Sequence, residues 1–226
     1  MPDFCADMRG ILPGRGGAPQ PGPLAAAPAC GTFPAVSVQD FRPEPSAGHV
    51  EAIAGGMFSG KSEELVRRLR RAAIARQTVQ VFKPASDVRH SPGRLVTRDN
   101  RELEAVAVTC SGELRGKLLP GVQVVGIDEA QFFDAGLVQL VGELADAGVR
   151  VIVAGLDLDY LRRPFGPMPR ILAIAEYVDK VHAVCMRCGA AAHYSQRIAG
   201  GGEQLQVGDT ESYEARCRRC YEAFEP

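Results

Sequence analysis

The sequence predicts an α/β fold: a mostly parallel sheet that carries a phosphate-binding loop, with a small cysteine-rich lobe after it. Three observations support this prediction. Short apolar runs alternate with helical patterns, a glycine-rich segment lies at 55–62, and four cysteines form two pairs near the end of the chain. Such runs are typical of buried parallel strands joined by crossover helices. We divide the 226 residues into a segment 1–47, a domain 48–183 and a lobe 184–226.

The first segment differs from the rest in composition. It holds nine of the 16 prolines, many Gly and Ala, and no apolar period. Such a composition cannot bury enough apolar surface to order itself. We expect either a disordered extension or a start read too far upstream, with Met8 as another candidate. Asp3 and Asp7 argue against a transit peptide, which is normally poor in acidic residues.

The formal net charge is −1, so the chain has no overall basic field that would attract nucleic acid or an anionic membrane. No run of about 18 apolar residues is present, and the start lacks the pattern of a secretory signal. We therefore expect a cytoplasmic enzyme with no nucleic-acid or membrane partner. Its cysteines are then expected to be metal ligands or free thiols, because disulfides are rare in a reducing compartment.

Six apolar runs are the predicted strands of the sheet. A helix predicted at 62–76 is marked by acidic residues in its first turn and arginines toward its end, as the helix dipole favours. Leu65, Leu69, Ala72 and Ala73 form its apolar face. The predicted strands are 50–54, 78–82, 105–108, 122–127, 149–154 and, with less apolar character, 180–184.

Between the first strand and this helix lies a P-loop motif, G-x(4)-G-K-[ST]. Its glycines let backbone N–H groups surround a phosphate, Lys61 reaches the β- and γ-phosphates, and the Ser62 hydroxyl can bind Mg²⁺. The position between a strand and a capped helix favours ATP binding over an ordinary glycine-rich turn. The motif consists of Gly55, Gly56, Met57, Phe58, Ser59, Gly60, Lys61 and Ser62.

A second part of the phosphate site is expected where the strand at 122–127 ends. Asp128 is the predicted partner of Mg²⁺, together with Ser62. The neighbouring Glu129 suits a general base that takes a proton from an attacking hydroxyl. A solvated carboxylate, or one that orients water in an ATPase, is the alternative for Glu129.

Two C-x2-C knuckles predict a structural zinc site. Four thiolates complete a tetrahedral zinc site with no open position, so we do not expect His182 or His193 to be ligands. A disulfide pair or a redox dithiol is the alternative. The 28 residues between the knuckles exceed the roughly 15 to 20 of a common zinc ribbon, which suggests that this loop has its own task. The predicted ligands are Cys185, Cys188, Cys217 and Cys220.

Taken together, these segments resemble the zinc-containing thymidine kinases over about residues 49–224. The likeness rests on Gly-Gly-Met-Phe-Ser-Gly-Lys-Ser-Glu-Glu-Leu-Val-Arg-Arg from Gly55, Ile-Asp-Glu-Ala-Gln-Phe-Phe from Ile127, Gly-Leu-Asp-Leu-Asp-Tyr from Gly155, Pro-Phe-Gly-Pro from Pro164, and Ser-Tyr-Glu-Ala-Arg-Cys from Ser212. The motifs occur in the family's order, which the P-loop alone would not establish.

The resemblance implies transfer of the ATP γ-phosphate to the 5'-hydroxyl of thymidine, with deoxyuridine as a further possible acceptor. It also implies a RecA-like core, a zinc lobe and a homotetramer. Glu129 resembles the family's catalytic base, and Asp128, Glu129, Ala130 and Gln131 its nucleotide-side loop. Asp87 and Arg89 fall in the flexible segment after the second strand. The implied nucleoside contacts are Met57, Phe132, Leu156, Tyr160, Phe165 and Tyr213, with the lasso residues Gln204, Leu205, Gln206, Val207 and Gly208.

The sequence departs from the family pattern at two places, and two other functions are compatible with its motifs. Tyr160 stands where Phe is common in the family, and the proline-rich residues 1–47 lie outside its pattern. One rival is a RecA-like ATPase with a nucleic-acid-binding zinc ribbon, in which Glu129 activates water. The other is a nucleotide kinase with a zinc-stabilised lid, although such a lid is expected in the middle of a chain.

Overall fold

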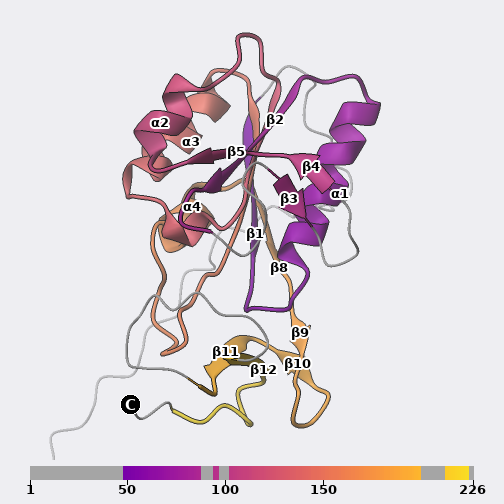
Figure 1. Cartoon of the computed structure of the whole chain (residues 1–226), viewed down its shortest axis with the longest axis vertical. Coiled ribbons are helices and arrows are strands. Elements are labelled where there is room, and N and C mark those ends of the chain that lie inside the picture. The colour runs from indigo at the N-terminus through magenta and orange to yellow at the C-terminus, as the bar shows by residue number, and fades with distance from the viewer. Residues whose placement is uncertain (1–47, 88–93, 97–101, 200–211, 224–226) are drawn as a thin grey trace, which may run out of the picture. The chain divides into compact units, whose positions relative to one another are not determined.

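Six parallel strands form the central sheet of this protein, in the order β5-β2-β6-β7-β1-β8. Helices lie on both sides of this sheet (Figure 1). The computed structural model describes residues 48–87, 94–96, 102–199 and 212–223, so the predicted extension 1–47 lies outside it. Every pairing within the sheet is parallel. The strands are β1 (His49–Ala54), β2 (Val79–Pro84), β5 (Val106–Val108), β6 (Val124–Ile127), β7 (Arg150–Gly155) and β8 (Tyr177–Lys180).

Helices cover both faces of the sheet, which explains why its inner strands are apolar on both sides. On β1, Val50, Ala52 and Ala54 face one apolar cluster and Ile53 faces the other, as the alternation of a strand requires. The cluster around Ile53 includes α1 (Lys61–Ile74), and the opposite cluster includes α2 (Ser111–Gly116), α3 (Gly136–Asp146) and α4 (Met168–Ile174). Of the helices described, none has the length and apolarity needed to cross a bilayer.

The helix α1 packs closely on the sheet. Leu65 and Leu69 are completely buried, and each contributes roughly 2 kcal/mol by leaving water. A Cβ atom on Gly126 of β6 would lie 2.6 Å from Leu69 Cδ1, so a glycine is needed for this approach. The helix spans Lys61–Ile74 and not 62–76, because Arg76 has a φ of 61° that a helix cannot continue through.

Five of the six predicted strands are present with ends that differ by one or two residues. The prediction of a single strand at 180–184 is wrong. The chain pairs with β1 through β8, which ends at Lys180, and Ala183–Val184 forms a separate strand, β9. The residues 178–180 of β8 are exposed, so this edge strand has no apolar run by which the sequence could reveal it.

Short antiparallel strands build the C-terminal lobe. The strand β9 pairs with β10 (Ala191–Ala192), and β11 (Tyr194–Arg197) pairs with β12 (Tyr213–Arg216). The strands β3 (Arg94–Val96) and β4 (Glu102–Glu104) form a further antiparallel pair that the sequence did not predict. The small lobe core contains Ala183, Ala192 and Ala215 beside two cysteines. So few apolar groups bury little surface, and a domain of this kind commonly needs a metal for stability.

A buried carboxylate ties three strands to α1. Glu51 of β1 accepts hydrogen bonds from Arg150 Nε (2.6 Å), Arg68 Nη1 (2.6 Å) and His49 Nε2 (3.1 Å). Arg68 also bonds Asp179 of β8. Burial alone would raise the pKa of Glu51, but the three donors outweigh it and hold that pKa at about 2. The network therefore stabilises the charged carboxylate.

Replacing Glu51 by Gln should lower the free energy of unfolding by about 3 kcal/mol at neutral pH, since two partly buried guanidinium groups lose their buried carboxylate. The folded pKa lies below the ordinary value of 4.5, so this contribution is complete above about pH 4.5 and is lost as the pH falls toward 2. Urea unfolding at several pH values measures both effects. The difference between parent and variant should shrink on acidification. Glu143→Gln, at an exposed carboxylate paired with Arg115, is the control and should barely shift the unfolding midpoint.

Candidate active site

The P-loop joins the end of β1 to the first turn of α1, as the sequence predicts. Gly60 precedes the helix in the left-handed conformation, with a φ of 82°. The Lys61 side chain is buried and donates from Nζ to the carbonyl oxygen of Gly56 at 2.8 Å. Ser59 Oγ donates to the same oxygen at 2.8 Å. The lysine thus lies along the loop, at the position from which a P-loop lysine reaches phosphate oxygens.

The two predicted magnesium ligands are in direct contact. Ser62 Oγ donates to Asp128 Oδ2 at 2.9 Å, although the residues belong to α1 and to the end of β6. A hydroxyl and a carboxylate are the hard oxygen ligands that Mg²⁺ prefers. The chemistry of this pair therefore fits the ion, and its role remains a prediction.

Burial and, after it, the charge of Glu129 raise the pKa of Asp128 to about 7, although the Ser62 hydroxyl and Lys61 oppose the rise. Asp128 is only 4% exposed. An adjacent cation favours the ionised form of a carboxyl group, and the ionised form is the one that ligates a metal. The site is therefore an environment in which a bound cation would be strongly favoured.

Glu129 follows immediately, in the turn after β6. Its φ and ψ of 49° and 41° are left-handed, which is uncommon for a residue other than glycine. The 3-10 helix η1 (Ala130–Phe132) begins after it. Gln131 donates from Nε2 to Glu129 Oε2 at 2.5 Å and accepts from the Leu156 N–H at 2.9 Å. The turn after β6 and the end of β7 are thereby connected.

Predicted nucleoside contacts come together in two groups. Phe132 and Phe165 form an edge-to-face pair with ring centroids 5.8 Å apart. Tyr160 and Tyr213 both contact the completely buried Arg197, whose guanidinium carbon lies 3.6 Å from the Tyr160 ring centroid. Arg197 Nη2 also donates to the Tyr213 hydroxyl at 2.7 Å. Aromatic walls of this kind suit a flat ligand.

Of the remaining predicted site residues, the structure describes some and leaves others outside its described ranges. The Met57 N–H donates to Ser195 Oγ of β11 at 2.9 Å, which joins the P-loop to the lobe. Asp87 lies in the turn after β2, where its N–H bonds the Pro84 carbonyl. Arg89 and the lasso residues 204–208 lie outside the described part of the chain.

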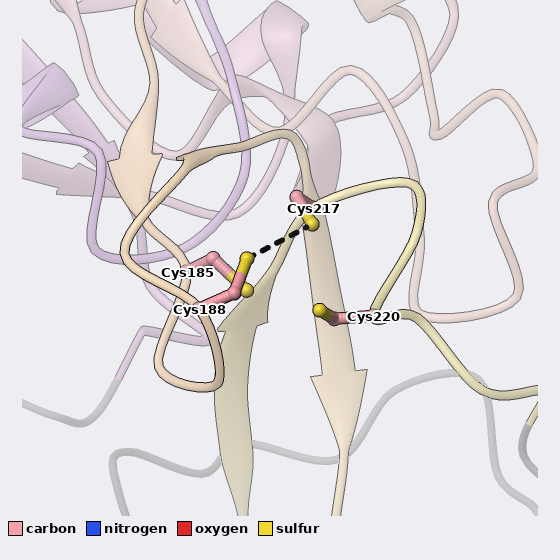
Figure 2. A group of neighbouring side chains, drawn as sticks. All are labelled: Cys185, Cys188, Cys217 and Cys220. Atoms are coloured by element: carbon pink, nitrogen blue, oxygen red, sulfur yellow. Dashed lines mark hydrogen bonds between the residues drawn. The ribbon is translucent and has the colours of Figure 1, made fainter.

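The four predicted zinc ligands converge, although the two knuckles are far apart in the sequence (Figure 2). Their sulfur atoms all lie within 4.8 Å of one another, and Cys188 Sγ is 3.6 Å from Cys217 Sγ. A tetrahedral site with Zn–S bonds of about 2.3 Å has sulfurs about 3.8 Å apart. None of the cysteines described is in a disulfide. The cluster fits a structural metal such as zinc, and the disulfide alternative is wrong for these four.

The thiols also differ sharply in acidity. Burial opposes ionisation of Cys185, but hydrogen bonds from the backbone of Cys217, Arg187 and Cys188 lower its pKa to about 6. The contact with Cys188, together with burial, raises the pKa of Cys220 to about 12. Four sulfurs so close cannot all lose their protons without a cation between them. A bound metal would supply that charge.

Comparison with known proteins decides the family. The thymidine kinase family model matches residues 48–221. This chain belongs to the thymidine kinase family. The match confirms the resemblance proposed from the motifs.

Individual thymidine kinases agree over the same region. A thymidine kinase of Porphyromonas gingivalis is 53% identical over 174 residues, which cover 77% of this chain and 85% of the relative. Thymidine kinases of Bacteroides fragilis and of a Rhodothermus species are 49% and 50% identical, covering 77% and 80% of this chain and 87% and 84% of theirs. Among solved structures, domain III of the Thermotoga maritima replication initiation protein DnaA overlaps 61% of this chain and 56% of its own. Its TM-score of 0.37 and identity of 16% are too low to support an argument.

Two residues that touch predicted site residues escaped the sequence analysis. Ser195 and Arg197 lie on β11, and both are buried. In the sequence they belong to a polar stretch, Tyr-Ser-Gln-Arg, without an apolar period. They are buried only in the tertiary structure, where β11 pairs with β12, Met57 contacts Ser195 and the Tyr160 ring covers Arg197, so no local pattern could have revealed them.

Metal analysis of the purified protein should find about one zinc ion per chain, because the four sulfurs complete one tetrahedral site. Cys217→Ser should lower the zinc content and the unfolding temperature, since Cys217 is a buried member of the cluster. Cys110→Ser is the matched control, because that cysteine lies outside the cluster. A metal-free parent protein that is fully folded would contradict the assignment.

Proposed function

We propose that this chain transfers the γ-phosphate of ATP to the 5'-hydroxyl of thymidine and releases thymidine monophosphate. The observation that carries the proposal is the contact between Ser62 of the P-loop and Asp128, with Glu129 beside it. This contact supports a site in which a phosphate-binding loop and a carboxylate that can act as a base meet at one edge of the sheet. The membership of the thymidine kinase family supports thymidine as the acceptor.

In this proposal, the P-loop and the first turn of α1 bind the phosphates of ATP. Loop N–H groups and the positive end of the helix face the anion, and Lys61 donates to phosphate oxygens. Ser62 and Asp128 would hold Mg²⁺, which neutralises charge on the phosphates when it is bound. The predicted nucleotide-side contacts of 128–131 belong to the same edge.

Glu129 acts as the general base. Its carboxylate accepts the proton of the 5'-hydroxyl as that oxygen attacks the γ-phosphorus. Phosphoryl transfer has a loose transition state, so catalysis depends mainly on the position of the two reactants and on charge stabilisation. The placement of Glu129 by its turn is therefore central to the rate.

The nucleoside would lie between aromatic walls that include Phe132, Phe165, Tyr160 and Tyr213. Flat apolar surfaces suit a pyrimidine ring, and main-chain groups of the lasso 204–208 would select its edge by hydrogen bonds. Met57 and Leu156 complete the set. Deoxyuridine, which lacks only a methyl group, is a further expected acceptor, since one methyl group is worth only about 1–3 kcal/mol.

Three further parts of the proposal concern the whole protein. Zinc at the four cysteines is structural, since it has no open position. The chain works as a cytoplasmic homotetramer. Its kinase domain ends near residue 183, and the lobe 184–226 carries the substrate lasso.

Glu129→Gln should abolish thymidine phosphorylation, with a fall of at least about a hundredfold in kcat, because an amide cannot accept the proton. ATP binding, measured by calorimetry, should stay within about threefold of the parent, because the P-loop is unchanged. Transfer of labelled phosphate from ATP to a panel of nucleosides measures the activity. Glu143→Gln removes an exposed carboxylate of α3 and should retain full activity.

One outcome of the same assay would contradict the proposed function. A parent protein that phosphorylates no pyrimidine nucleoside, and instead hydrolyses ATP faster when DNA is added, would overturn the proposal. It would favour the nucleic-acid-dependent ATPase.

A further inference from the structure

Gln131 lies next to the proposed base, and its side chain is engaged at both ends. It is 3% exposed. The amide nitrogen donates to Glu129 Oε2, and the amide oxygen accepts from the Leu156 N–H at 2.9 Å. The first bond reaches the base and the second reaches the main chain after β7. The amide therefore links the Glu129 carboxylate to a fixed point of the sheet.

Two glycines lie close to Gln131, one beside its side-chain amide and one beside its main-chain carbonyl. A Cβ atom on Gly155 would lie 2.9 Å from Gln131 Oε1, and one on Gly166 would lie 2.1 Å from the Gln131 carbonyl oxygen. Gly166 also has a φ of 52°, which other residues rarely adopt. The end of β7 and the loop after it therefore fit tightly around Gln131. The main chain at Gly155 lies close to the side-chain oxygen and so restricts the rotamers of the Gln131 amide.

A glutamate side chain has three rotatable bonds, so its carboxylate is poorly placed without a partner. Misplacing a reacting group by about 1 Å can cost about a hundredfold in rate. The hydrogen bond from Gln131 selects one orientation of the carboxylate. The left-handed backbone of Glu129 sets the direction of the side chain, and Gln131 fixes its far end.

The same contacts argue against a direct role in nucleotide binding. The resemblance places Gln131 among the nucleotide-side residues 128–131. In the structure its oxygen binds Leu156 and its nitrogen binds Glu129. Both polar atoms thus serve the arrangement of the site.

We propose that Gln131 is a positioning residue. Its amide oxygen is held by the Leu156 N–H, and its amide nitrogen in turn holds the Glu129 carboxylate in one orientation. This inference rests on the proposed kinase function. It predicts that Gln131 affects turnover far more than substrate binding.

Gln131→Glu is the sharpest variant. It keeps the size of the side chain and an oxygen for the Leu156 N–H, but it replaces the donor to Glu129 by a second carboxylate. We expect kcat for thymidine to fall by about 10- to 100-fold. The KM values for thymidine and ATP should stay within about threefold, because the residue contacts neither substrate in this proposal.

A matched control exists in Gln80 of β2. This glutamine is also buried, donates from Nε2 to the Lys117 carbonyl at 2.8 Å, and accepts from the Leu119 N–H at 2.9 Å. Gln80→Glu introduces the same buried charge among bonds that do not reach the site. Its kcat should equal that of the parent. If Gln131→Glu does not fold, Gln131→Met, which adds no charge, is measured with the same expectations.

A double-mutant cycle separates positioning from a general structural role. In the Glu129→Gln background there is no base to position, so Gln131→Glu should reduce the residual turnover by less than about twofold. An undiminished further loss in that background would overturn the inference. So would parental kcat for both Gln131 variants, or an equal loss in Gln80→Glu. A parent without thymidine phosphorylation would instead refute the proposed function, and the inference with it.

Discussion

Because the six strands of the central sheet are parallel, their carboxyl ends meet at one edge, and every proposed function of the core depends on this constraint. The P-loop follows β1, the carboxylates 128 and 129 follow β6, and Leu156 follows β7. Parallel sheets bind ligands at this edge in general. The strand β7 separates β6 from β1 in the sheet, yet Ser62 and Asp128 touch. The loops after the strands bring together groups that the sheet alone leaves apart.

Two buried carboxylates of the same domain have pKa values that are shifted in opposite directions. Glu51 is surrounded by three donors and stays charged far into acid. Asp128 is buried beside a second carboxylate, and its pKa rises to about 7. The first environment stabilises the fold, whereas the second costs stability and favours binding of a cation. Perturbed groups of the second kind are typical of functional sites.

The features that the sequence predicted are those encoded locally. The P-loop could be recognised because its glycines, Lys61 and Ser62 are adjacent, and the knuckles because each pair of cysteines is two residues apart. Asp128 and Glu129 were predicted because they directly follow an apolar run. The strand β8 was misplaced, since an exposed edge strand has no apolar pattern.

Other contacts arise only when distant segments fold together. The bond from Gln131 to Leu156 joins residues 25 positions apart, and nothing near Gln131 in the sequence indicates its partner. Arg197 is charged and would be expected at the surface, but it is completely buried in contact with Tyr160 and Tyr213. Predicting such contacts requires the tertiary structure, because their energy comes from packing and not from local propensity.

The hydrogen bond from the Met57 N–H to Ser195 has a mechanical consequence. One amide of the P-loop is already committed to the lobe, so it is not among the donors that can turn toward a phosphate. The strand that accepts it, β11, is paired with β12, and β12 leads directly into Cys217. A change in the conformation of the P-loop must therefore either move β11 or break this hydrogen bond. A displacement of the metal-binding lobe must likewise either move the loop or break the bond. The P-loop is therefore linked to the metal-binding lobe through one hydrogen bond and one strand pair.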